Sequence, residues 1–192
     1  MTHAYEDTYL AEAMNNLGDM FDYAINTLGH EPDQFYSKFI ISRMANQFGH
    51  GNPKYVAGLS GPELALRVLH KTGCEVVDIP SPPVSTEQTP EFWAGRALAY
   101  YQWFTTRTFS YMRGHGLTFA RILPLYSTLH ASDLSAFVEA ADHIINESLC
   151  SVRKVQLCKY KRLKSAIHLY SSALCKELIG RCTPPAQPEN NA

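Results

Sequence analysis

The stretch QFGHGNPKYVAGLSGPEL (residues 47–64) separates two helix-like segments and decides how the fold is predicted. Glycine often follows the last residue of a helix, so Gly49 and Gly51 indicate that a helix ends here. Ser60 is a typical N-cap residue, and Glu63 three positions later completes a capping box. The stretch therefore predicts a connector between the end of one helix and the start of the next.

A glycine-rich stretch could also bind a phosphate group, so the known phosphate-binding patterns need to be considered. The pattern G-x-x-x-x-G-K-[ST] is absent from the chain. Gly49, His50 and Gly51 lack a third glycine at the dinucleotide-binding spacing, and no predicted strand precedes them. The backbone after Ser60 could bind an anion, but Glu63 already compensates the dipole of that helix. We therefore favour a connector over a phosphate site.

On both sides of this connector, apolar residues recur at the spacing of an α-helix. Ser60 and Thr89 are predicted N-caps, and Pro32 and Pro90 are suited to the first helical turn. The pattern predicts an all-α protein. The expected helices cover residues 10–28, 32–48 and 61–72, a segment that begins at Pro90, a short segment interrupted at Pro124, residues 134–149, and one or two segments after residue 150.

Composition predicts two helical units in the chain. Residues 1–73 form an acidic three-helix unit, and the proline-rich residues 74–88 have no helical period and read as a linker. Residues 89–180 form an aromatic-rich unit with a basic C-terminal helix, in which we interpret the aromatic side chains as core. The composition of residues 181–192 is typical of a disordered tail.

The cysteines and the apolar segments of the chain indicate whether it binds a metal and where in the cell it is found. The chain has 192 residues and five cysteines, whose spacings match no zinc-binding pattern, so free thiols are favoured over a metal site. No apolar run approaches the length of a membrane helix, and no signal peptide is visible. We therefore expect a soluble, cytoplasmic protein that is not membrane-bound and has no cofactor and no metal.

The net charge of −1 hides an acidic half and a basic end. Residues 1–91 carry 12 acidic and 5 basic side chains, whereas residues 149–192 carry 2 acidic and 8 basic ones. Within the first helix, Glu12, Asp19 and Asp22 fall on the polar face. This face is either simply solvated or binds a basic partner, and it could imitate the phosphates of a nucleic acid.

A basic patch lies near the C-terminus of the chain. Six positive charges within twelve residues could neutralise the phosphates of a nucleic acid. The alternative is a solvated helix face, or a contact with the acidic half. The patch consists of Arg153, Lys154, Lys159, Lys161, Arg162 and Lys164.

The common catalytic motifs are missing from the sequence. Neither H-E-x-x-H nor G-x-S-x-G occurs, and no pair of carboxylates has a catalytic spacing. Glu139 and His143 lie four residues apart, on one face of a predicted helix, but a surface hydrogen bond is favoured there over a metal ligand or a base. The sequence therefore predicts a binding protein rather than an enzyme.

Three strings carry a resemblance to known proteins: YLAEAMNNLGDMFDYAINTLG (residues 9–29), FIISRMANQFGHGNPKYVAGLSGPEL (residues 39–64) and FWAGRALAYYQWFT (residues 92–105). Residues 4–148 resemble small proteins carried on mobile elements of gut Firmicutes. In such proteins a repressor-like helix-turn-helix often follows, but the C-terminal residues here lack that pattern. The chain is also similar to type II-A anti-CRISPR proteins in its size, its acidic first half and its lack of a catalytic motif.

This resemblance implies a protein of a phage or plasmid that binds Cas9, or its complex with guide RNA, and blocks DNA recognition or cleavage. Cas9 holds nucleic acid in a basic channel and reads its short adjacent motif with arginines. An acidic surface formed by Glu12, Asp19 and Asp22 would complement such a site. The alternative is a nucleic-acid-binding regulator, as in a toxin–antitoxin-like locus, that acts through the basic patch.

Overall fold

The computed structural model describes residues 3–74, 76, 79–81, 88–151, 153, 154, 159, 160 and 162. Helices, turns and loops account for these residues, and no strand occurs among them, so the predicted all-α class is confirmed. The chain divides into two compact units, Met1–Ser148 and Leu149–Ala192. In the second unit, the described residues are all helical. The predicted tail over residues 181–192 lies outside the described residues.

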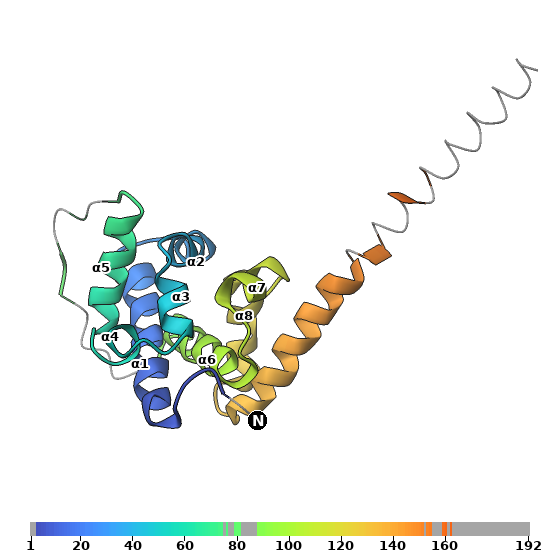
Figure 1. Ribbon diagram of the computed structural model, residues 1–192, viewed down its shortest axis with the longest axis horizontal. Coiled ribbons are helices and arrows are strands. Elements are labelled where there is room, and N and C mark those ends of the chain that lie inside the picture. The colour runs from blue at the N-terminus through green and yellow to red at the C-terminus, as the bar shows by residue number, and fades with distance from the viewer. Residues whose placement is uncertain are drawn as a thin grey trace, which may run out of the picture. The chain divides into compact units, whose positions relative to one another are not determined.

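The first unit is built around α1 (Leu10–Asp22) and α6 (Pro90–Thr105), which pack extensively against each other (Figure 1). A Cβ atom on Gly95 would lie 2.6 Å from the carbonyl oxygen of Leu17, so only glycine allows the two backbones to approach this closely. The second neighbour of α1 is α5 (Gly61–Lys71). As predicted, aromatic side chains of α6 such as Trp93 and Trp103 are buried in the core.

The structure divides the chain differently from the prediction of two units separated at residues 74–88. Residues 1–73 and 89–148 lie in the same compact unit, because α1 and α6 pack face to face. The described part of the predicted linker also contacts this unit: the hydroxyl of Tyr23 donates a 2.7 Å hydrogen bond to the carbonyl of Pro80. Proline content thus marks a long connection between packed helices here, not a boundary between units.

The remaining helices of the first unit are mostly short. A π-helical turn (Tyr23–Thr27) continues α1, 3-10 turns cover Asp7–Tyr9 and Leu123–Leu125, and residues 134–148 are helical. Among the described helices, none is long and apolar enough to cross a membrane. The other helices are α2 (Pro32–Ile41), α3 (Met44–Gly49), α4 (Pro53–Val56), α7 (Phe109–Gly114), α8 (Phe119–Ile122) and α9 (Tyr126–Leu129).

The predicted single helix over residues 32–48 is broken into α2 and α3. The buried side chain of Ser42 donates a 2.8 Å hydrogen bond to the carbonyl of Phe39 and accepts one of 3.3 Å from the backbone N–H of Met44. These bonds replace helical backbone bonds, which is a known effect of serine. Arg43 then takes a positive φ of 62°, and the chain turns into α3.

The stretch of residues 47–64 forms the predicted connector with one added element. The backbone N–H of Ser60 donates a 2.8 Å hydrogen bond to the Glu63 carboxylate, and the backbone N–H of Glu63 donates one of 3.4 Å to the Ser60 hydroxyl, so the capping box is confirmed. Between the two helices, Asn52 caps the short α4 by accepting a 3.1 Å hydrogen bond from the backbone N–H of Lys54. The connector is therefore ordered along its length.

Candidate functional site

The predicted acidic residues lie on the face of α1 that is turned away from the core. Glu12 and Asp19 are exposed, Asp22 is half-buried, and their spacing places them along one side of the helix. Asn26, one turn further on, donates hydrogen bonds of 2.8 Å to Asp22 and 3.1 Å to Glu91 of α6. We call this group of Glu12, Asp19, Asp22, Asn26 and Glu91 the acidic surface.

Within the acidic surface, Asp22 already has partners inside the protein. Its Oδ1 atom accepts hydrogen bonds from the hydroxyl of Thr89 and the amide of Asn26. Thr89 is the N-cap of α6 and also accepts a 3.0 Å hydrogen bond from the backbone N–H of Phe92. Asp22 therefore helps to start α6, a role that the sequence pattern did not indicate.

Asp19 differs from Asp22, because it is exposed and has no side-chain partner among the described residues. A Cβ atom added to Gly61 would lie 2.3 Å from the Cβ of Asp19, so the first residue of α5 packs directly on Asp19. Partial burial raises the pKa of the Asp19 carboxyl, and the nearby charge of Asp22 raises it further. The fold thus holds a carboxylate at a place where its own charge is disfavoured.

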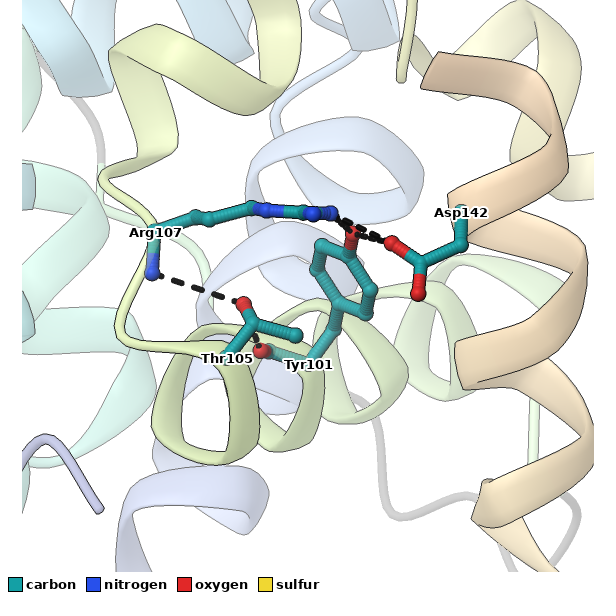
Figure 2. A network of polar contacts seen from close by, with 4 residues as sticks. All are labelled: Tyr101, Thr105, Arg107 and Asp142. Carbon is teal, nitrogen blue, oxygen red and sulfur yellow. Dashed lines mark hydrogen bonds and ion pairs between the residues drawn. The ribbon is translucent and has the colours of Figure 1, made fainter. Parts of the chain in front are cut away.

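A polar network on another part of the first unit was not predicted. Figure 2 shows three of its side chains: Tyr101 from α6, Arg107 from the turn that follows α6, and Asp142 from the helix over residues 134–148. The Tyr101 hydroxyl donates a 2.6 Å hydrogen bond to Asp142, and the Arg107 guanidinium contacts both of these side chains. Burial raises the pKa of Tyr101, and the Asp142 carboxylate raises it further. This network ties the helix over residues 134–148 to α6.

The raised pKa of Tyr101 keeps its phenol protonated, so it is a hydrogen-bond donor here and not a base. The backbone N–H of Arg107 also donates a 3.4 Å hydrogen bond to Thr105, whose hydroxyl donates one of 2.7 Å to the Tyr101 carbonyl (Figure 2). These bonds fix the chain where it leaves α6. We therefore interpret the network as structural.

The predicted basic patch is described only in part. Arg153, Lys154, Lys159 and Arg162 are helical and exposed, whereas Lys161 and Lys164 lie outside the described residues. All six belong to the second compact unit. The four described side chains are thus available to solvent, as a phosphate-binding role would require.

The predicted hydrogen bond between Glu139 and His143 is not present. Instead, His143 lies 3.5 Å from Glu147, and both side chains are exposed. Glu147 also pairs with Arg121 at 2.5 Å. Across the described ranges, no three His, Cys, Asp or Glu side chains gather as a metal ion would need.

One cavity was not predicted from the sequence, and we call it the Gln102 cavity. It has a volume of about 780 Å³ and is lined by residues of three segments: residues 3–4, residues 40–50 from the end of α2 to His50 after α3, and residues 102–110 at the junction of α6 and α7. Gly49 and His50 of the glycine-rich stretch are part of its wall. Its segments are far apart in the sequence, so no local pattern could predict it.

Comparisons with known proteins leave the family of the chain open. No family model, no curated protein and no solved structure matches it. The resemblance based on residues 9–29, 39–64 and 92–105 stays a prediction. We therefore infer function from the geometry of the described residues.

Proposed function

We propose that the protein is a non-catalytic binding protein of a bacterial mobile element, and that its acidic surface binds a basic site on a protein partner. The observation that carries this proposal is the pair formed by Asp19 and Asp22. Partial burial raises the pKa of the Asp19 carboxyl, and the nearby charge of Asp22 raises it further. Among the described ion pairs, none involves either of them or Glu12.

Two like charges held side by side destabilise the free protein, and a cation supplied from outside would relieve this repulsion. Residues whose pKa is shifted by burial and neighbouring charges are common at functional sites. Asp19 is exposed and has Glu12 seven positions before it, so a partner could reach both. Arginine is the expected counterpart, because its guanidinium forms two parallel bonds with a carboxylate.

As the partner, we propose guide-loaded type II-A Cas9, on the basis of the resemblance to anti-CRISPR proteins. Cas9 binds the DNA motif next to its target with arginines that face the major groove. A carboxylate surface presented by a rigid helix would compete with DNA for such arginines. Inhibition would then result from occupying the DNA site, and it would weaken as the salt concentration rises.

Co-elution and cleavage assays with purified guide-loaded Cas9 test this proposal. The wild-type protein should co-elute with the complex and slow target cleavage. Asp19→Asn and Glu12→Gln should each weaken inhibition by about tenfold, which corresponds to one charged hydrogen bond. Asp22 is a poor choice for the test, because its replacement would also disturb the cap of α6.

Glu139→Gln is the matched control, since Glu139 is an exposed carboxylate outside the acidic surface. It should inhibit as well as the wild type. The proposed partner is wrong if the wild-type protein neither co-elutes with loaded Cas9 nor slows cleavage. The proposed surface is wrong if inhibition occurs and both Asp19→Asn and Glu12→Gln retain it in full.

The exposed basic residues favour a second candidate, a nucleic-acid-binding regulator. Arg153, Lys154, Lys159 and Arg162 present four charges to solvent. Binding through such residues must weaken steeply as salt rises, because counterions are released from the nucleic acid. A mobility-shift titration at several salt concentrations tests this. Charge reversal at Lys159, Lys161 and Arg162 should abolish a genuine shift, and a shift that survives it excludes the basic patch.

A further inference from the structure

Residues 3–9 precede α1, and we call this segment the N-terminal strap. None of its residues is buried: four are half-buried and three are exposed. The helix that follows is different, because α1 buries six residues, among them Leu17 and Met20. Segments with few buried apolar groups open locally at a much lower free energy than unfolding of the whole domain requires. The strap is therefore held in place by a few specific contacts and not by a core of its own.

Three successive residues of the strap contact Trp103 of α6. The ring of His3 lies 3.7 Å from the ring of Trp103, centroid to centroid. The backbone N–H of Ala4 donates a 3.0 Å hydrogen bond to the carbonyl of Trp103, and the indole N–H of Trp103 donates one of 3.0 Å to the carbonyl of Tyr5. Among the described residues, no other hydrogen bond joins residues 3–6 to a residue outside the strap. Because all three contacts share one residue, we expect them to form and break together.

The closed strap contains a buried group that lacks a hydrogen bond. The hydroxyl of Tyr5 is buried, and no described residue donates a hydrogen bond to it or accepts one from it. The same side chain packs on the glycine-rich connector, since a Cβ atom added to Gly51 would lie 2.3 Å from the Cβ of Tyr5. A buried hydroxyl without a partner destabilises the state that buries it, and water would satisfy the hydroxyl once the strap opens. Tyr5 thus lowers the free energy of opening.

Opening of the strap would change two features of the first unit. Trp103 is 6% exposed, and its ring lies 5.8 Å from the ring of Tyr100, which lies 6.0 Å from that of Phe104. Without the strap, Trp103 would join the half-buried Tyr100 and Phe104 as an accessible aromatic surface at the end of α6. His3 and Ala4 also form one wall of the Gln102 cavity, so their departure would open the cavity on that side.

We propose that the N-terminal strap opens and closes as a unit while the rest of the first unit stays folded. The closed strap covers Trp103 and forms a wall of the Gln102 cavity, and the open strap exposes both. The two states differ in the contacts to one tryptophan and in the hydration of one hydroxyl. This device goes beyond the proposed binding of a partner by the acidic surface, and it uses none of the same residues.

Native-state hydrogen exchange, followed by NMR on the full chain, tests the proposal. The backbone N–H of Ala4 and the indole N–H of Trp103 should report the same free energy of opening, because one movement breaks both bonds. Relative to their unprotected rates, both should exchange at least about hundredfold faster than the backbone N–H groups of Leu17 and Met20 in the core. Different free energies at the two strap sites, or core-like protection of the indole N–H, would show that the strap frays or stays closed and would overturn the proposal.

Tyr5→Phe tests the contribution of the unsatisfied hydroxyl. It stabilises the closed state, so both strap protons should exchange about tenfold more slowly than in the wild type. Tyr9→Phe is the matched control within the strap and should change nothing, because the Tyr9 hydroxyl is not among the buried groups that lack a partner. Unchanged or faster exchange in Tyr5→Phe contradicts the proposed difference between the two states.

Ala4→Pro should shift the strap toward the open state. Proline lacks the N–H that bonds to the carbonyl of Trp103, so the indole N–H should exchange at least about tenfold faster, and acrylamide should quench the tryptophan fluorescence more strongly. Ala4→Ser retains the N–H and should behave like the wild type. Protection of the core N–H groups, measured in the same samples, shows whether each variant is folded.

Two results with Ala4→Pro would contradict the proposal. Equal loss of protection in the strap and in the core would make the strap a part of the global fold, and unchanged quenching would mean that Trp103 stays covered. Should Ala4→Pro fail to fold, exchange in the wild type and in Tyr5→Phe decides the matter, because both proteins keep every hydrogen bond of the strap.

Discussion

The hydroxyl of Thr89 donates a hydrogen bond to the carboxylate of Asp22, which connects the N-cap of α6 to the middle of the acidic surface. The two residues are 67 positions apart in the chain. Thr89 also accepts the cap bond from the backbone of Phe92, so its one oxygen serves both helices. One member of the predicted acidic face therefore stabilises the fold, while Asp19 and Glu12 stay available to solvent.

Thr89→Val should destabilise the protein by about 1–2 kcal/mol, because it removes the side-chain cap of α6 as well as the donor to Asp22. Asp22→Ala should also destabilise it. The two effects should not add, since both changes break the same bond. Urea unfolding of the single and double variants measures the coupling.

Thr118→Ala is the matched control for this cycle. Thr118 is the N-cap residue of α8 but makes no side-chain cap bond, so its loss should change stability by less than about 0.5 kcal/mol. Additive effects of Thr89→Val and Asp22→Ala would show that the bond between the two residues does not contribute to stability.

Asp19 should make stability depend on pH in an identifiable way. Its pKa is raised in the folded state, so the folded protein holds this proton more tightly than the unfolded chain does. The stabilisation from that proton is complete below the unfolded pKa of about 3.9 and is lost as pH rises through the folded pKa. Asp19→Asn should therefore be more stable than the wild type at pH 7.

The difference between Asp19→Asn and the wild type should shrink toward pH 3, where the carboxyl is protonated in both states. Urea unfolding at a series of pH values measures it. A variant that is less stable than the wild type at pH 7 would contradict this explanation. Combined with the binding assay, a gain in stability and a loss of inhibition in the same variant would mark Asp19 as a residue that serves binding.

Asp142→Ala should destabilise the first unit by about 1–2 kcal/mol. The buried hydroxyl of Tyr101 loses its acceptor, while solvent screens the partly exposed pair with Arg107 and limits the total. Glu139→Ala, an exposed change on the same helix, is the control and should have little effect. Equal unfolding midpoints for the two variants would mean that the network in Figure 2 does not hold this helix to α6.

The parts of the fold that depend on neighbouring residues could be predicted from the sequence. The capping box of Ser60 and Glu63 spans four residues, and the spacing of Glu12 and Asp19 follows from the helical period. The break at Ser42 was missed, because the apolar pattern continues across it. The helix ends there because of the hydrogen bonds that the Ser42 side chain makes, and these are visible in the structure but not in the sequence pattern.

Contacts between distant segments could not be predicted. The spacing of the acidic residues did not indicate that Asp22 has a partner inside the protein and Asp19 does not, because that partner is Thr89, which is distant in the sequence. The Gln102 cavity requires three separate segments to meet, so no local pattern could predict it. The glycine-rich stretch does border this cavity through Gly49, whose carbonyl accepts a hydrogen bond from Gln102, but it does not form a phosphate-binding loop of a recognised pattern.

Cys74 should react faster with alkylating reagents at neutral pH than an ordinary thiol does. The ammonium of Lys38 donates a 3.1 Å hydrogen bond to its sulfur, and this bond lowers the pKa of the Cys74 thiol. The thiolate is the reactive form, so a lower pKa gives more of it at pH 7.

Lys38→Met should slow modification of Cys74 by iodoacetamide at pH 7, and the difference should vanish near pH 10, where the thiol is ionised in both proteins. Peptide mapping by mass spectrometry follows Cys74 separately from the other four cysteines. Lys54→Met, which removes a lysine from α4, should leave the rate unchanged; equal rates in the wild type and Lys38→Met at pH 7 would show that Lys38 does not activate this thiol.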